Sequence, residues 1–139
     1  MQTTYENNCF IPAKVDQLEK IVPKVWGHEE WIVNDTKYCG KKLVFKEAGY
    51  ACSLHFHKIK DETFYVNKGS IIVELENNTK KWSRIMTPGD VQRIEPGLKH
   101  RIIALEPAEV IEFSTYHRDD DSYRIIDAGK VDLSLYVQQ

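Results

Sequence analysis

Short runs of apolar residues alternate with turn-forming residues along most of the chain. From Trp26 onward these runs are rich in Val, Ile, Tyr, Phe and Trp, which favour extended strands. Turn signals such as Asn-Asp, Asn-Asn and Pro-Gly recur after about 8 to 12 residues. The runs span 29–34, 41–48, 51–57, 62–67, 70–75, 81–86, 91–95, 100–106 and 109–117. This spacing predicts an all-β sandwich or barrel.

A helical signal precedes the strands. The segment DQLEKIV at 16–22 offers Asp16 as an N-cap, has Glu19 three residues later and is followed by Pro23. This arrangement predicts one or two turns of helix. Because no long amphipathic helix separates the later runs, the pattern argues against a parallel βαβ fold. We expect an N-terminal arm or strand over 1–23 and a barrel with a C-terminal tail over 24–139.

Composition fits one soluble domain and narrows its partners. The 139 residues are 42% hydrophobic and 29% charged, with a formal net charge of -2, which is ordinary for a globular protein. A charge this small gives no reason to expect nucleic acid or a membrane as partner. No signal peptide or membrane span is evident. Cys9, Cys39 and Cys52 form no Cys-x-x-Cys pair, which predicts reduced thiols and a cytoplasmic protein.

Two histidines one residue apart open a candidate metal site. His55 and His57 project from the same side of a strand, because strand side chains alternate. Glu62 begins the next run after a charged turn, and His100 is a fourth candidate. Imidazoles with a carboxylate suit Mn, Zn, Fe, Co or Ni and leave positions open for a substrate. The alternative is a polar surface pair, the commoner role of an isolated His-x-His on a strand.

The spacing of these residues resembles the first motif of the cupins. That motif runs Gly, five residues, His-x-His, three or four residues, Glu, six residues, Gly. The chain fills every position with Gly49, His55, His57, Glu62 and Gly69. The resemblance implies a single-domain cupin, a double-stranded β-helix or jelly-roll barrel with the metal inside its mouth.

A second segment resembles the other cupin motif. Gly89 and His100 keep the expected glycine-to-histidine spacing, with Pro96 one place late and Ala104 where Asn is common. Together the two motifs imply one divalent transition metal bound by His55, His57, Glu62 and His100.

The flanking segments resemble the isomerase domain of type II mannose-6-phosphate isomerases. The resemblance lies in KVWGHEEWIVN at 24–34, in a lysine seven residues before Gly49, in PGLKHRI and in the closing segment VIEFSTYHRDDDSYRIID. The larger enzymes commonly carry Gln where this chain has His55, so the full ligand set is more similar to D-lyxose isomerase. The resemblance implies catalytic roles for Lys42 and Glu112, and substrate binding by Lys24, Trp26, Arg101, Asp121 and Arg124.

The implied function is a metal-dependent aldose–ketose isomerase acting on a sugar or a sugar phosphate. Lys42, its pKa lowered by the metal, and Glu112 would exchange the proton. A solvated Lys42, or a structural pairing of Glu112 with Arg124 or Arg101, is the alternative for those residues. A cupin dioxygenase and a non-catalytic sugar-binding or sensor cupin are the alternative functions. We also expect a homodimer formed through the N-terminal strands.

Overall fold

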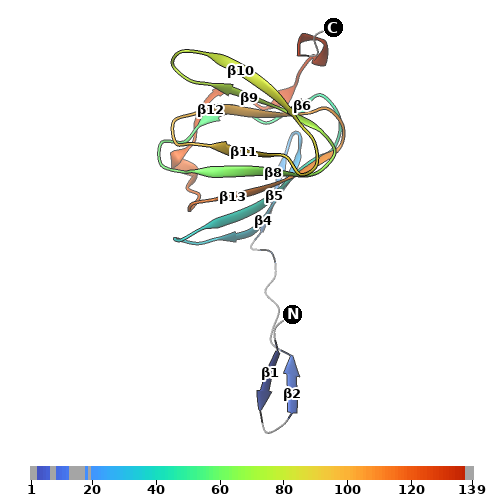
Figure 1. Cartoon of the computed structure of the whole chain (residues 1–139), viewed down its shortest axis with the longest axis vertical. Coiled ribbons are helices and arrows are strands. Elements are labelled where there is room, and N and C mark those ends of the chain that lie inside the picture. The colour runs from blue at the N-terminus through green and yellow to red at the C-terminus, as the bar shows by residue number, and fades with distance from the viewer. Residues whose placement is uncertain (1–2, 7–8, 13–17, 19, 137–139) are drawn as a thin grey trace.

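The computed structural model describes residues 3–6, 9–12, 18 and 20–136 (Figure 1). Two antiparallel sheets form a barrel-like sandwich. Sheet 1 has the strand order β11 (Val91–Ile94), β8 (Glu62–Lys68), β13 (Ala108–Ser114), β5 (Cys39–Phe45), β4 (Gly27–Asn34) and β3 (Lys20–Lys24). Sheet 2 has the order β10 (Lys81–Met86), β9 (Ile71–Glu76), β12 (Lys99–Ala104), β6 (Tyr50–Ala51) and β15 (Gly129–Lys130), with β7 (Leu54–Phe56) pairing both β12 and β14 (Tyr123–Ile126). The predicted all-β jelly roll is confirmed.

The segment expected to be helical is instead extended in its described part. Residues 20–24 form β3, which pairs with β4 at the edge of sheet 1, whereas Asp16, Gln17 and Glu19 lie outside the described residues. An edge strand tolerates Pro23, because a missing N–H costs no ladder bond on the open side. Sheet 1 therefore already includes residues that the sequence assigned to the arm.

Further N-terminal, β1 (Thr3–Glu6) and β2 (Cys9–Pro12) pair with each other as a separate two-stranded sheet. The helical elements of the described chain are the short 3-10 turns η1 (Asp119–Asp121) and η2 (Leu133–Leu135). Within the described ranges, no helix has the length and hydrophobicity needed to cross a membrane.

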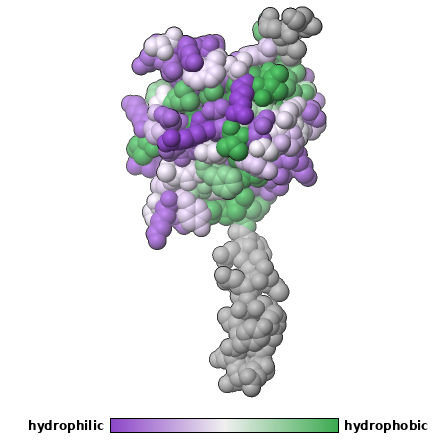
Figure 2. Space-filling view, in the orientation of Figure 1, coloured by the Kyte–Doolittle hydropathy of each residue, from purple (hydrophilic) through white to green (hydrophobic). Residues whose placement is uncertain are grey.

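The core lies between the two sheets and follows from strand alternation. In β5, every second residue is buried along the whole strand. Residues from both sheets share one apolar cluster, including Phe45, Phe64 and Val110 from sheet 1 and Leu75 and Ile102 from sheet 2. Hydrophilic and hydrophobic residues are interspersed on the surface of the barrel (Figure 2), as expected for strands that bury one face.

A second, smaller cluster explains why β9 and β12 are buried on both faces. Ala51, Ile72 and Ile103 point to the outside of sheet 2, where Leu133 and Tyr136 pack against them. The C-terminal segment thus covers the outer face of this sheet, and polar residues on that face become buried as well.

Gly27 provides a stability test of the β4–β5 contact. Its φ is 148°, and a Cβ at this position would lie 1.8 Å from the backbone oxygen of Val44. Gly27→Ala should therefore lower the free energy of unfolding by about 3 kcal/mol or more, since backbone atoms must move. Gly89→Ala is the control, because Gly89 also has positive φ but open space around it; it should cost only about 1 kcal/mol. Equal losses in denaturant unfolding would contradict this explanation.

Candidate metal centre and its pocket

Three histidine rings meet at one end of the space between the sheets. His55 lies on β7 directly across from His100 on β12, and His57 follows β7. Their available ligand atoms all lie within 4.8 Å of one another. Phe56, between the two neighbouring histidines, points away and stacks on Tyr123. Strand alternation therefore places both histidines on the pocket side.

Each ring is held by a hydrogen bond that defines its tautomer. The Nδ1–H groups of His55, His57 and His100 donate to the backbone oxygens of Ser53, Asp121 and Leu98 at 2.9, 2.8 and 2.9 Å. A carbonyl oxygen only accepts, so Nδ1 must carry the proton. Burial also lowers the pKa of His55 to about 3. In a neutral ring of this tautomer, Nε2 presents a lone pair, which is the form that binds metals.

Glu62, on β8 of sheet 1, completes the cluster from the opposite sheet. Its Oε2 lies 3.2 Å from His57 Nε2 and 3.1 Å from His100 Nε2. In the neutral tautomer that the Nδ1 hydrogen bonds select, the Nε2 lone pairs of His57 and His100 face this carboxylate oxygen. Glu62 Oε2 and His100 Nε2 are buried without a hydrogen-bond partner among the described residues.

Buried acceptors that face one another are costly unless a cation joins them. The donor set of three imidazole nitrogens and one carboxylate oxygen fits a divalent transition metal such as Mn, Zn, Fe, Co or Ni. The structure therefore brings together the four residues that the sequence predicted as ligands, and their chemistry suits that role.

The turn between β7 and β8 positions this cluster, and Asp121 fixes the turn. The Asp121 carboxylate accepts hydrogen bonds from the backbone N–H groups of Lys58, Ile59 and Lys60 at 2.9 to 3.2 Å. Asp121 itself is buried. It was predicted to bind substrate, but its carboxylate is used by the backbone and its carbonyl by His57. Its contacts are those of a positioning residue.

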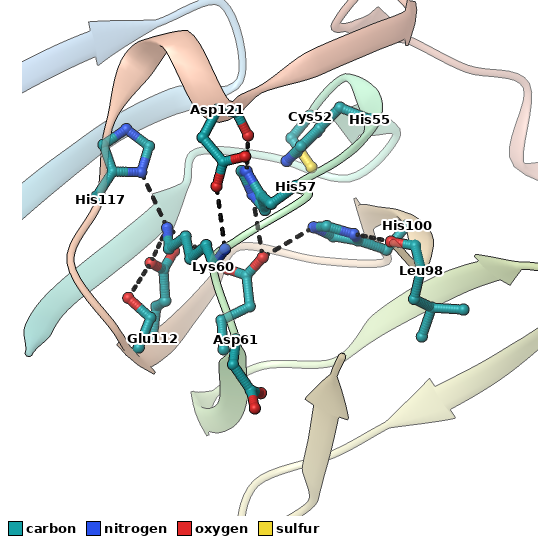
Figure 3. A network of polar contacts seen from close by, with 12 residues as sticks. Cys52, His55, His57, Lys60, Asp61, Leu98, His100, Glu112, His117 and Asp121 are labelled. Atoms are coloured by element: carbon teal, nitrogen blue, oxygen red, sulfur yellow. Dashed lines mark hydrogen bonds and ion pairs between the residues drawn. The ribbon is translucent and has the colours of Figure 1, made fainter. Parts of the chain in front are cut away.

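A second charged group lies beside the metal cluster. Glu112 on β13 forms an ion pair with Lys60, whose Nζ lies 2.5 Å from Glu112 Oε2 and 3.8 Å from Glu62 Oε1. Lys60 Nζ also donates to Nδ1 of His117 at 3.0 Å, as Figure 3 shows. Glu112 is therefore paired, but with Lys60, and not with Arg101 or Arg124.

His117 is a neutral member of this network. Burial lowers its pKa to about 4, and the ammonium groups of Lys60 and Lys41 act in the same direction. The neutral ring accepts from Lys60 and donates through Nε2–H to Asp119 at 2.9 Å. No local sequence signal marks Lys60 or His117, since one lies in a turn and the other just beyond a strand.

The three histidines line one pocket of about 560 Å³ together with Glu62, Lys60, Glu112 and His117. This volume is within the usual range of small-molecule sites. Of the residues predicted to bind substrate, Lys24, Trp26 and Arg124 line it as well. Trp26 is buried and stacks on Phe45 with ring centroids 4.5 Å apart. Arg124 projects from β14, which pairs with the strand that carries His55.

The prediction that Lys42 faces this cavity is wrong. Lys42 lies on the outer face of sheet 1, where its Nζ is 3.6 Å from Glu30 and 3.2 Å from Glu109. The Glu109 carboxylate raises the pKa of Lys42, opposite to the expected direction. Its neighbour Lys41 points inward and is buried. The buried positions Leu43 and Phe45, two and four residues on, are the sequence signal that would have selected Lys41.

Arg101 also lies away from the pocket. It is buried on the outer side of sheet 2, where its Nε donates to Glu74 at 2.9 Å and its guanidinium donates to the Tyr136 hydroxyl at 2.8 Å. Because His100 faces the metal cluster, the next residue along β12 must face the other way. Arg101 anchors the C-terminal segment and does not meet a ligand in the pocket.

Comparisons with known proteins give a family match and several structures with a similar fold. A family model described as "Cupin domain" matches residues 43–116. An oxalate decarboxylase from Bacillus subtilis is similar in fold, with a TM-score of 0.70 and 19% identity over 82% of this chain and 33% of that chain. KdgF from Halomonas sp. gives a TM-score of 0.58 and 29% identity over 67% of this chain and 81% of that chain.

The capsular polysaccharide assembling protein CapF from Staphylococcus aureus gives a TM-score of 0.69 and 16% identity over 77% of this chain and 34% of that chain. The chain thus spans about a third of the length of the decarboxylase and CapF chains. No curated protein sequence matches it significantly.

Metal binding should be measurable in the purified protein. We expect about one divalent transition metal per chain in elemental analysis, and a lower melting temperature after chelation that added Mn, Zn or Ni restores. His57→Ala should abolish both effects, because the remaining ligands form an incomplete site. His28→Ala is the matched control, since His28 pairs with Glu30 outside the pocket. A metal-free protein whose stability ignores added metal would contradict the assignment.

Proposed function

Because the chain belongs to the cupin domain family, we propose that it is a metal-dependent aldose–ketose isomerase acting on a sugar or sugar phosphate. The observation that supports this proposal is Glu112, a buried carboxylate that lines the same pocket as the three histidines. Further support comes from the resemblance of residues 24–34 and 110–127 to sugar isomerase segments.

Aldose–ketose isomerisation moves one proton between two adjacent carbons and a second proton from the hydroxyl oxygen to the carbonyl oxygen; solvent water can carry the second. A divalent cation held by His55, His57, His100 and Glu62 would supply Lewis-acid polarisation of the substrate oxygens. Glu112 is the proton carrier in this proposal: its carboxylate takes the proton from one carbon and returns it to the next. A single carboxylate can do both if the substrate stays in place.

Lys60 replaces Lys42 as the lysine of the site. Burial lowers the pKa of Lys60, but the negative charges of Glu112 and Glu62 outweigh this effect and raise it. Lys60 therefore stays protonated and is not the base. Its ammonium holds Glu112 in place, and it can stabilise negative charge that develops on a substrate oxygen.

The remaining pocket residues suit a polar, sugar-sized substrate. Trp26 offers an apolar ring face, as sugar-binding sites commonly require, while Lys24 and Arg124 offer hydrogen-bond donors. Lys24 lies 4.0 Å from Glu29, and Arg124 is loosely paired with Asp127 at 3.5 Å. Both cations therefore keep donors for a ligand.

Replacement of Glu112 tests the chemistry. Glu112→Gln should lower kcat by about 100-fold or more, because it removes the proton carrier, while metal content stays unchanged. Glu109→Gln is the control on the same strand, since Glu109 faces outward and pairs with Lys42 and Lys68; it should keep wild-type turnover. The assay follows interconversion of pentoses, hexoses and their phosphates, with deuterium uptake at carbon 1 or 2.

Two results would reject the isomerase. Turnover that requires oxygen would favour a dioxygenase, and ligand binding without any turnover across the sugar panel would favour a binding or sensor protein. Wild-type activity in Glu112→Gln would leave the isomerase class intact but remove Glu112 from its mechanism.

We further propose that the protein is a homodimer, with an interface on the outer face of sheet 1 in place of the N-terminal strands expected from the sequence. The outer face of sheet 1 exposes Phe113, Val91 and Tyr65 (58%, 51% and 37% exposed) around Ile111. The ion pair Arg93–Asp61 borders these apolar residues. A surface that carries apolar residues beside both charge signs can contact a second copy of itself across a twofold axis.

Sedimentation at micromolar concentration should therefore give the mass of a dimer. Phe113→Arg should shift the protein to monomer, because a charge would be buried in the contact. Ile85→Arg is the control: Ile85 is as exposed as Phe113 but lies on β10 of the other sheet. A monomeric wild-type protein, or dissociation by both variants alike, would exclude this interface.

A further inference from the structure

A row of charged side chains crosses the inner face of sheet 1 beside the metal cluster. The strand register pairs Lys20 with Trp31, Trp31 with Lys41, and Lys41 with Glu112. All four residues line the pocket. Lys20 lies outside the cupin motifs and the flanking segments, and Lys41 received no role from them. Only the pairing of β3, β4, β5 and β13 brings both lysines into line with Glu112.

Two of these lysines share one aromatic ring. Lys20 Nζ and Lys41 Nζ lie 4.0 and 3.9 Å from the centroid of the Trp31 ring. The electron-rich face of an indole attracts cations, so Trp31 holds ammonium groups that would otherwise repel each other. Trp31 is itself fixed, because it is buried and its Nε1–H donates to Glu29 at 2.9 Å.

This corner has more positive than negative charge. Glu29 lies 3.7 Å from Lys41 Nζ and 4.0 Å from Lys24 Nζ. No other carboxylate in the described part of the chain lies within 4.0 Å of either ammonium group. Lys20 has no carboxylate that close among the same residues. Within 4.0 Å, these three ammonium groups therefore share one carboxylate of the described residues, and Asp119, on the pocket wall, is a more distant negative charge that acts on Lys41 and Lys20.

Of these three lysines, Lys41 is the most deeply buried. It is only 2% exposed, and its ammonium makes no hydrogen bond to any residue in the described ranges. Its nearest carboxylate oxygen, on Glu29, is 3.7 Å away, so the ammonium keeps donors for a ligand, and Lys41 lines the cavity into which a substrate would enter. An oxyanion at this place would accept hydrogen bonds from the Lys41 ammonium and balance the excess positive charge of the lysines.

We propose that Lys20, Lys24, Trp31 and Lys41 form an anion subsite that binds the phosphate or carboxylate group of the substrate. The inference rests on the proposed function in one respect, that the substrate reaches the metal cluster from this subsite. Glu112 follows Lys41 in the row, so a substrate anchored at Lys41 lies with its carbon chain across Glu112. The substrate class is then an anionic sugar, either a sugar phosphate or a sugar acid.

Isothermal titration of the metal-loaded full-length protein tests the subsite. The probes are inorganic phosphate, then glucose 6-phosphate, glucuronate and glucose. We expect the anionic probes to bind more tightly than glucose, with affinity that falls as salt increases. Tighter binding of glucose 6-phosphate than of glucuronate assigns the subsite to phosphate, and the reverse order assigns it to carboxylate.

Lys41→Met and Lys42→Met make a matched pair, because they remove the same charge from adjacent residues on opposite faces of β5. Lys41→Met should weaken binding of the preferred anion about tenfold or more, as expected for a lost charged hydrogen bond, whereas Lys42→Met should not. Lys20→Met is the second variant: Lys20 is exposed on the edge strand, so its removal should weaken binding without unfolding the protein.

Equal affinities of Lys41→Met and Lys42→Met for the anion, or glucose binding as tight as its charged derivatives, would overturn the subsite. Anion binding that depends on Lys41 but leads to no sugar turnover would support the subsite and count against the isomerase. Turnover of neutral sugars alone would support the isomerase and overturn the subsite.

Discussion

The hydrogen bonds of Asp121 are the constraint on which the metal centre depends. One carboxylate satisfies three consecutive backbone N–H groups of the turn 58–60, and the carbonyl of the same residue orients the ring of His57. The turn leads directly into Glu62 and carries Lys60. A single residue, more than 60 positions away along the chain, thus positions one ligand on each side of the turn and the cation that pairs with Glu112. Asp121 lies beyond residues 43–116, the part of the chain that matches the cupin family model. The segment that follows β13 therefore completes the site.

The pocket contains charges that contribute little to folding. Burial of an ion pair such as Lys60–Glu112 costs desolvation that the mutual attraction only partly offsets, and an apolar pair of similar volume would serve stability as well or better. The same applies to Lys41, whose nearest carboxylate oxygen is 3.7 Å away. Buried charges gathered around a cavity are characteristic of functional sites. The opposing groups also control one another: Lys60 is kept protonated by the carboxylates around it, which leaves the carboxylate as the group able to accept a proton.

Local spacing made part of this site predictable. Gly49, His55, His57 and Glu62 lie close together along the chain, around the short strands β6 and β7, one turn and the start of β8. Strand alternation sends both histidines to one side. The jelly-roll fold could be predicted for the same reason, since alternation and turn residues are read within short windows. The predictions for Lys42 and Arg101 failed because each was assigned to the wrong face of its strand. Each is next to a residue that does face the interior, and a shift of one position in a strand reverses the face.

The sequence by itself determined the strands, the turns and the group of metal-ligand candidates, because these follow from contacts among near neighbours. The tertiary structure alone decided which distant charges become partners. Lys20, Trp31, Lys41 and Glu112 line up only through the pairing of four strands. Lys60 reaches Glu112 only because Asp121 folds its turn inward. These pairings depend on register and on long-range hydrogen bonds, which no short stretch of sequence specifies.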